Sequence, residues 1–132
     1  MSNNTQFMSV IDDEPDIMCL FKDALSQMKD FRLFGFTDSM LALEHFIHYR
    51  SNYRLILSDY RIPGLNGIQL LKYVKKINPS VKTMLISAFD MEDRLFKEFK
   101  CVDKILQKPI SIPELVNEVE VLLPNRYDCL TH

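Results

Sequence analysis

The sequence predicts an α/β fold, in which a parallel sheet of five strands carries helices on both of its faces. Three observations lead to this prediction. Five short apolar runs alternate with five stretches whose apolar residues recur at helical spacing. Each parallel connection needs a helical crossover, and right-handed crossovers place helices against the sheet. Hydrophobic residues make up 47% and charged residues 26% of the 132 residues, which is typical of one globular domain.

The five expected strands are apolar runs that end at turn or capping residues. The third is the most informative, because Leu-Ile-Leu-Ser runs directly into Asp59 and is followed by the turn pairs Pro63-Gly64 and Asn66-Gly67. An apolar run bounded in this way is typical of a buried strand. The expected strands cover residues 7–11, 31–36, 55–59, 81–86 and 101–106.

The five expected helices begin at residues that favour helix starts. Asp12, Asp13 and Pro15 precede the first helix, Thr37 or Asp38 caps the second, and the third begins after the Asn-Gly turn. The segment 111–114, Ser-Ile-Pro-Glu, is a capping box that opens the last helix. Apolar residues recur at helical spacing within 17–28, 42–47, 70–77, 91–99 and 115–123.

Composition and charge exclude several other classes of protein. The net charge of -2 gives no indication of a nucleic-acid groove or of binding to an anionic membrane surface. No apolar stretch approaches the length of a membrane span, and the polar N-terminus is unlike a signal peptide. Cys19, Cys101 and Cys129 contain no C-x-x-C pair, so we expect reduced thiols in a cytoplasmic protein. We expect one domain over residues 1–124 and a short tail over 125–132.

Polar side chains follow four of the five expected strands. Asp12 and Asp13 come after the first strand, Asp59 after the third, Ser87 after the fourth and Lys108 after the fifth. Parallel α/β sheets bind ligands beyond the carboxyl ends of their strands, so in a doubly wound sheet these residues would share one crevice. Three neighbouring carboxylates repel one another and should share a proton or bind a cation. All-oxygen ligands suit Mg²⁺.

The same set of side chains fits phosphoryl chemistry. A hydroxyl and an ammonium group can hold phosphate oxygens, and a carboxylate can attack phosphorus to form an aspartyl phosphate. We therefore interpret Asp59 as the nucleophile of a metal-assisted phosphoryl acceptor. Taken singly, Asp12 and Asp13 could be helix caps, Asp59 a turn residue, and Ser87 and Lys108 structural. Their occurrence together at four strand ends favours the functional interpretation.

These residues and their surroundings resemble the receiver domain of two-component response regulators. The resemblance covers approximately residues 7–123 and rests on four segments. It implies a flavodoxin-like, doubly wound sheet in the order 2-1-3-4-5. It also implies a signalling module rather than an enzyme, which promotes only its own phosphorylation and dephosphorylation. The four segments are residues 10–15 (VIDDEP), 57–67 (LSDYRIPGLNG), 85–88 (LISA) and 107–110 (QKPI).

The resemblance implies a role for each residue of the pocket. Asp59 would accept a phosphoryl group from a histidine kinase or a phosphotransfer protein. Asp13, Asp59 and the backbone carbonyl of Arg61 would bind Mg²⁺ directly, and Asp12 would act through water. Ser87 would donate a hydrogen bond to the phosphoryl group, and Lys108 would pair with it electrostatically. The Lys108–Pro109 bond would be cis. The output would be a downstream partner protein, and a phosphorylation-dependent homodimer is a further option.

Two positions bear on how the phosphoryl group is sensed and retained. Ile105 stands where the family usually has a Tyr or Phe that rotates inward on activation. This departure leaves a pseudo-receiver scaffold with weak or no switching as an alternative. Arg61 and Phe89 stand where the family influences hydrolysis of the phosphoryl group, and we expect Phe89 to shield it from water.

Two other functions agree less well with the sequence. A haloacid-dehalogenase-like phosphatase would have its nucleophile in an Asp-x-Asp pattern on the first strand, whereas the Asp12-Asp13 pair is adjacent. A flavodoxin-like nucleotide binder needs a Ser-, Thr- or Gly-rich phosphate loop at this point, and two aspartates would repel a phosphate. We expect His45 and His48 to be surface or helix-flank residues. Four lysines are expected on a solvated face: Lys72, Lys75, Lys76 and Lys82.

Overall fold

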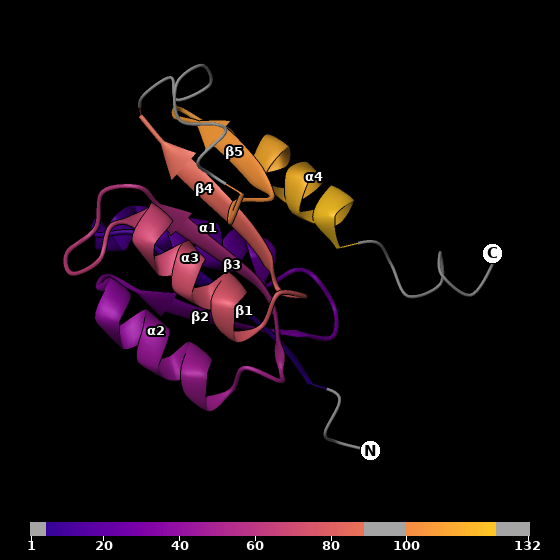
Figure 1. Ribbon diagram of the computed structural model, residues 1–132. Helices are drawn as coiled ribbons and strands as arrows, with labels where there is room; N and C mark the ends of the chain where they lie inside the picture. Colours follow the sequence, from indigo (N-terminus) through magenta and orange to yellow (C-terminus); the bar gives the residue numbers. More distant parts are fainter. Residues whose placement is uncertain (1–4, 89–99, 124–132) are drawn as a thin grey trace.

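A parallel sheet of five strands forms the centre of the molecule. The computed structural model describes residues 5–88 and 100–123. Its strands lie in the order β2-β1-β3-β4-β5, which confirms the order implied by the resemblance (Figure 1). All four neighbouring pairs are parallel. The strands are β1 (Gln6–Ile11), β2 (Phe31–Phe36), β3 (Tyr53–Asp59), β4 (Lys82–Ser87) and β5 (Lys104–Gln107).

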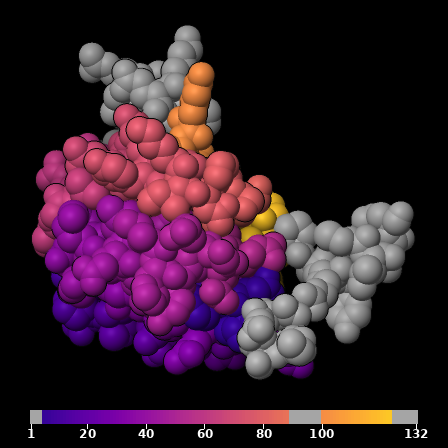
Figure 2. Space-filling model, turned by 60° about the horizontal axis from the view of Figure 1, so that its bottom comes forward, coloured from indigo at the N-terminus to yellow at the C-terminus, as the bar shows by residue number. Residues whose placement is uncertain are grey.

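Helices cover both faces of this sheet, as the alternating pattern predicts. On one face α2 (Ser39–His48) packs beside α3 (Gly67–Ile77), and on the other α1 (Pro15–Leu25) packs beside α4 (Ile112–Leu122) (Figure 1). Figure 2 shows the purple surface of α2 meeting the pink and salmon surface of α3. The helix expected within 91–99 and the tail over 125–132 lie outside the described residues, and so does Phe89.

Local capping residues set the helix starts. The Asp38 carboxylate accepts a hydrogen bond from the Met40 N–H at the start of α2, and the Ser111 hydroxyl accepts one from the Glu114 N–H at the start of α4. A full capping box between Asn66 and Gln69 begins α3. These contacts satisfy backbone N–H groups that have no partner within the helix.

The start of α1 differs from the others. Its N-cap residue is Glu14, which makes no side-chain cap, and Pro15 follows at the first helical position. The side chain of Asp12 instead accepts a hydrogen bond from the Glu14 N–H at 2.9 Å. The helix ends at Leu25, although the apolar pattern continues to Met28, whose N–H bonds back to the Leu25 carbonyl in a turn.

Alternating strand residues divide the core into two clusters, one on each face of the sheet. In β1, Phe7 and Ile11 face α2 and α3, whereas Met8 and Val10 face α1 and α4. Because the central strands are covered on both faces, they read as nearly continuous apolar runs. The side chains that cover the two faces of the sheet are therefore mostly apolar.

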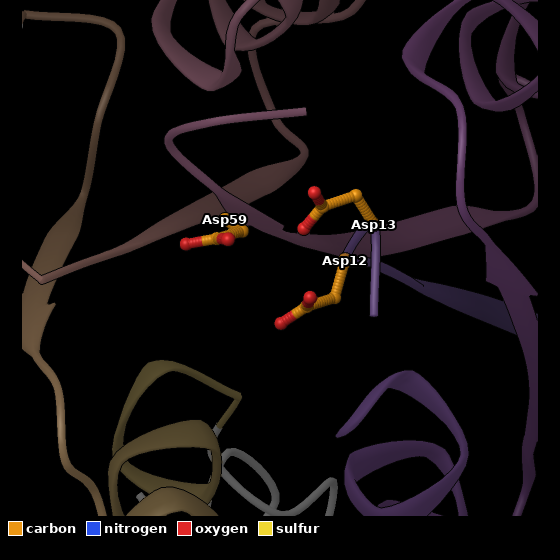
Figure 3. Close-up of side chains that lie close together, drawn as sticks. All are labelled: Asp12, Asp13 and Asp59. Atoms are coloured by element: carbon orange, nitrogen blue, oxygen red, sulfur yellow. The ribbon is translucent and has the colours of Figure 1, made fainter. Parts of the chain in front are cut away.

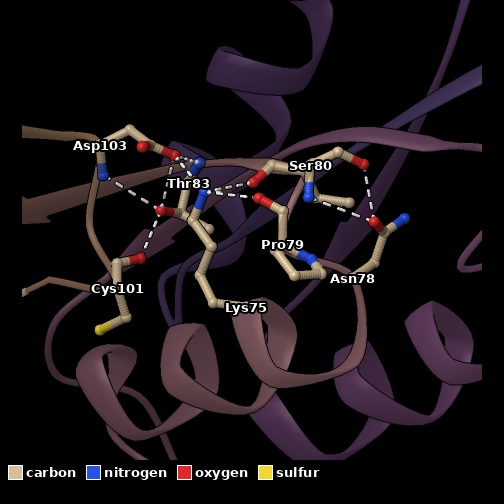
Figure 4. Close-up of polar contacts among 8 residues, drawn as sticks. Lys75, Asn78, Pro79, Ser80, Thr83, Cys101 and Asp103 are labelled. Carbon is tan, nitrogen blue, oxygen red and sulfur yellow. Dashed lines mark hydrogen bonds and ion pairs between the residues drawn. The ribbon is translucent and has the colours of Figure 1, made fainter.

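The structure corrects the predicted start of β5. The strand begins at Lys104, three residues later than predicted, because the preceding residues bond to Thr83 on β4. Thr83 donates its hydroxyl to the Cys101 carbonyl at 2.5 Å and its N–H to the Asp103 carboxylate at 2.8 Å. These contacts hold the segment before β5 in a turn (Figure 4).

Lys75 also departs from the prediction. It does not lie on a solvated face with the other lysines, because its ammonium group pairs with the Asp103 carboxylate at 2.7 Å and donates to the Val81 carbonyl at 2.8 Å (Figure 4). Lys72, Lys76 and Lys82 are exposed, as predicted. Among the described helices, none is long and apolar enough to cross a membrane.

Candidate functional site

The sheet order brings three carboxylates together at one edge of the sheet. β1 lies next to β3, so the residues that follow the end of β1 lie beside the residue that ends β3. One oxygen each from Asp12, Asp13 and Asp59 lies within 4.8 Å of the others (Figure 3). Asp12 is buried, Asp13 is exposed and Asp59 is intermediate. The sequence prediction that these three residues share one pocket agrees with this geometry.

Backbone contacts fix the orientation of Asp59. Its Oδ1 atom accepts a hydrogen bond from the Tyr60 N–H at 3.0 Å, and the same N–H reaches the Ile86 carbonyl at 2.9 Å. The Tyr60 carbonyl in turn accepts a hydrogen bond from the Gly67 N–H at 2.7 Å. The turn after β3 is therefore tied to both β4 and the start of α3.

Gly67 allows this turn to close. A Cβ atom at position 67 would collide with the backbone carbonyl of Asp59 and with the Leu85 side chain. Only a glycine permits so close an approach of α3 to the end of β3. The Asn66-Gly67 pair was read from the sequence as a turn signal, and the contact with the Asp59 backbone was not foreseen. No local sequence pattern reports that contact, because it depends on how α3 packs on β3.

Lys108 lies opposite two of the carboxylates. Its Nζ atom is 3.3 Å from Asp12 Oδ2 and 3.4 Å from Asp59 Oδ2. The Lys108 N–H donates to the Ser87 carbonyl at 2.8 Å, so the ends of β4 and β5 are joined at the pocket. The Lys108–Pro109 peptide bond is cis, as the resemblance implied.

Burial and charge set the ionisation of this pair. Burial raises the pKa of the Asp59 carboxyl, the Lys108 ammonium group lowers it, and the Asp12 carboxylate raises it again; the pKa ends above its usual value. For Lys108, burial lowers the pKa, but the Asp59 and Asp12 carboxylates outweigh this and raise it. Lys108 therefore remains a cation beside Asp59 at neutral pH.

The remaining predicted site residues lie at or near the same strand ends. Ser87 is fully buried at the end of β4, and Arg61 is exposed in the turn that follows Asp59. Ile105 is partly buried beside Leu85, its register partner on β4, on the sheet face covered by α2 and α3. The five strand-end residues thus lie at neighbouring strand ends, while Ile105 lies within β5, below these ends.

The family of the chain follows from comparison with known proteins. The family model described as the response regulator receiver domain matches residues 8–120, which is most of the chain. The chain belongs to the response regulator receiver domain family. Receiver domains are phosphorylation-dependent signalling modules of two-component systems, and they interact with histidine kinases or phosphotransfer proteins and with downstream partners. Phosphorylation at Asp and Mg²⁺ binding at an acidic pocket are general properties of the family.

Individual relatives support this assignment. Sporulation initiation phosphotransferase F of Bacillus subtilis is 26% identical over 117 residues, which cover 87% of this chain and 91% of the relative. The transcriptional regulatory protein CpxR homolog of Haemophilus influenzae is also 26% identical, but this chain spans only 48% of its length. Several curated relatives are therefore much longer than the matched region.

Solved structures show the same fold. A response regulator receiver domain protein from Clostridium thermocellum superposes with a TM-score of 0.80 at 22% identity, covering 95% of this chain and 98% of that one. The response regulator TrrA from Thermotoga maritima, solved in complex with Mg²⁺ and BeF, has a TM-score of 0.76 at 26% identity. The match covers 89% of this chain and 99% of TrrA.

Proposed function

We propose that Asp59 accepts a phosphoryl group from a histidine kinase or a phosphotransfer protein in a Mg²⁺-dependent reaction. The resulting phosphoryl group would then control binding to a partner protein. One observation carries the proposal: Asp59 ends β3 within 4.8 Å of oxygens of Asp12 and Asp13 and only 3.4 Å from the Lys108 ammonium group. This arrangement combines a nucleophile, a cation-binding set and a fixed positive charge.

The chain's own residues define the phosphorylation step. A carboxylate oxygen of Asp59 forms a bond to phosphorus, while the bond from phosphorus to the donor imidazole nitrogen breaks and leaves its electron pair on that nitrogen. The Tyr60 N–H holds Oδ1 of Asp59 and Lys108 lies beside Oδ2, so the carboxylate is oriented before the donor arrives. Lys108 and the Ser87 hydroxyl would then neutralise and hold the oxygens of the transferred group.

The carboxylate set fits a bound Mg²⁺ ion. Oxygen ligands with few protein donors suit Mg²⁺, and Asp12, Asp13 and Asp59 bring carboxylate oxygens within 4.8 Å of one another. We assign Asp13, Asp59 and the Arg61 carbonyl as direct ligands and Asp12 as a ligand through water. When bound, the ion would offset the repulsion between the Asp59 carboxylate and the incoming phosphoryl oxygens.

The name of one relative suggests a role for this chain in signalling. Phosphotransferase F is a phosphotransferase by name, and this chain spans 91% of it. We propose that the chain acts likewise in a phosphorelay, as a cytoplasmic domain over residues 1–124 with a tail over 125–132. Ile105 favours the second candidate, a scaffold that binds partners with weak or no switching, because its branched side chain has no ring to reorient towards Ser87.

Phosphorylation by a small acyl phosphate tests the proposal. The purified protein is incubated with acetyl phosphate and Mg²⁺, and intact mass gives the number of phosphoryl groups. We expect one group on the wild type and on Asp16→Asn, which removes an exposed acid from the first turn of α1. We expect none on Asp59→Asn. Full labelling of Asp59→Asn would overturn the proposal.

A further inference from the structure

His45 is partly exposed on α2 and lies beside several aromatic rings. Its imidazole centroid is 4.3 Å from the Phe34 ring, 4.7 Å from Tyr49 and 5.5 Å from Phe36. It also stacks on Phe7, with 6.0 Å between centroids and 27° between planes. The imidazole therefore joins α2 to β1 and β2, while it stays partly exposed on the flank of α2, as predicted.

A buried phenol provides the main polar contact of this imidazole. His45 Nδ1 is 2.8 Å from the hydroxyl of Tyr53, a residue of β3 that is only 3% exposed. Burial raises the pKa of Tyr53 to about 12, against a smaller opposing effect of the Ser9 hydroxyl. Tyr53 therefore stays uncharged across the physiological range and offers no negative charge to a protonated imidazole.

No carboxylate in the described part of the chain compensates a charge on His45. Among residues 5–88 and 100–123, no acid lies within ion-pair distance of it. The charged and titratable groups around it are His48 and Tyr49 on α2, Arg32 on β2 and Tyr53 on β3, whereas β1 contributes only the Phe7 ring. Burial, then His48, then Arg32 all lower the pKa of His45.

We propose that His45 is a proton-sensitive latch, which holds α2 against β1 and β2 while neutral and loosens that contact when protonated. The inference does not rest on the chemistry at Asp59, because His45 lies on α2, whereas Asp59 is the last residue of β3. Protonation puts a positive charge on a partly buried imidazole with which no described acid pairs, and this charge weakens the packing of the imidazole on the rings. Acidification thus acts on one helix of the domain.

The sign of the effect follows from linkage. In the unfolded chain a histidine titrates near 6.5, and in the folded protein the pKa of His45 is lower. The unfolded state therefore binds more protons, so stability from this site is present above about pH 6.5 and is lost as the pH falls. If His45 stayed neutral in the folded state, the unfolding constant would rise at most about tenfold between pH 7.5 and 5.5.

Titration of the individual histidines tests the latch. Imidazole NMR signals are assigned with His45→Gln and His48→Gln, a matched pair on the same helix. We expect His45 to titrate below the ordinary histidine value, and we expect α2 amides to exchange faster at pH 5.5 than at pH 7.5, relative to those of α3. An ordinary titration of His45, or α2 exchange that does not change relative to α3, would overturn the proposal.

The unfolding constant gives a second readout. Between pH 7.5 and 5.5 we expect the unfolding constant of His45→Gln to rise several-fold less than that of the wild type. We expect the unfolding constant of His48→Gln to rise as much as that of the wild type. Equal pH dependence in all three proteins would count against the latch. If His45→Gln does not fold, His48→Gln and His132→Gln variants assign the other two imidazole signals of the wild type. The remaining signal then belongs to His45, and its titration decides between the two outcomes.

Discussion

Opposing effects act on the pKa of the Asp59 carboxyl. Burial and Asp12 raise the pKa of its carboxyl, while Lys108 lowers it. A second cation near Asp12, Asp13 and Asp59 would relieve the remaining repulsion, which is the physical reason to expect a metal there. The residue types at the strand ends were readable from sequence, because a parallel topology forces carboxyl ends to one edge. Their combined effect on the pKa of Asp59 could not be read from the sequence, since it depends on distances and burial.

Replacing Asp13 separates metal binding from the rest of the pocket. We expect Mg²⁺ to raise the free energy of unfolding of the wild type by about 1.4 kcal/mol when the free ion is at ten times its dissociation constant. Asp13→Asn should lose most of this gain, because it removes an exposed ligand without disturbing the buried Asp12. Thermal unfolding with and without Mg²⁺ measures the gain.

The matched control for Asp13→Asn is Asp16→Asn. Asp16 is also an exposed acid, and it lies in the first turn of α1, outside the carboxylate cluster. We expect it to keep the full stabilisation by Mg²⁺. A similar loss in both variants would mean that the ion acts through general screening, and would speak against a site at Asp13.

At the scale of the elements, local patterns predicted most boundaries. β2 and α3 begin and end where the apolar patterns and caps place them, because capping and alternation are properties of short segments. The start of β5 could not be read in this way. It depends on hydrogen bonds from Thr83 to Cys101 and Asp103, residues about twenty positions away in the chain. Lys75 joins the same network through its ion pair with Asp103. The sequence of α3 does not distinguish Lys75 from the other lysines of this helix.

The Lys75–Asp103 pair should contribute measurably to stability. It joins the end of α3 to the segment before β5, with the two side chains 20% and 27% exposed (Figure 4). We expect Lys75→Met to lower the free energy of unfolding by about 1 to 2 kcal/mol, between the values typical of exposed ion pairs and of hydrogen bonds to charged groups. Chemical denaturation measures the change.

Lys72→Met is the matched control for this experiment. Lys72 lies on the same helix, one turn before Lys75, and is exposed. We expect its replacement to change stability by less than about 0.5 kcal/mol, as for most surface substitutions. Equal effects of the two replacements would show that the loss of a lysine from α3, and not the ion pair, lowers stability.

At the scale of the whole molecule, the sheet order converts separate sequence segments into one site. Placing β1 between β2 and β3, with β4 and β5 beyond, brings Asp12, Asp59, Ser87 and Lys108 to neighbouring strand ends. The alternation of strands and helices predicts a parallel sheet, but the order came from the family resemblance. Nothing in a single strand's sequence specifies which strand it pairs with in a parallel sheet, since that depends on burial over both faces.

The most direct test of the account is to locate the phosphoryl group within the carboxylate cluster. After reaction with acetyl phosphate and Mg²⁺, borohydride reduces an aspartyl phosphate to homoserine, and peptide mass spectrometry identifies the altered residue. Asp59 lies 3.4 Å from the Lys108 ammonium group and is less buried than Asp12, so we expect homoserine at position 59 and aspartate still at positions 12 and 13. Homoserine at position 12 or 13, with Asp59 unaltered, would contradict the account.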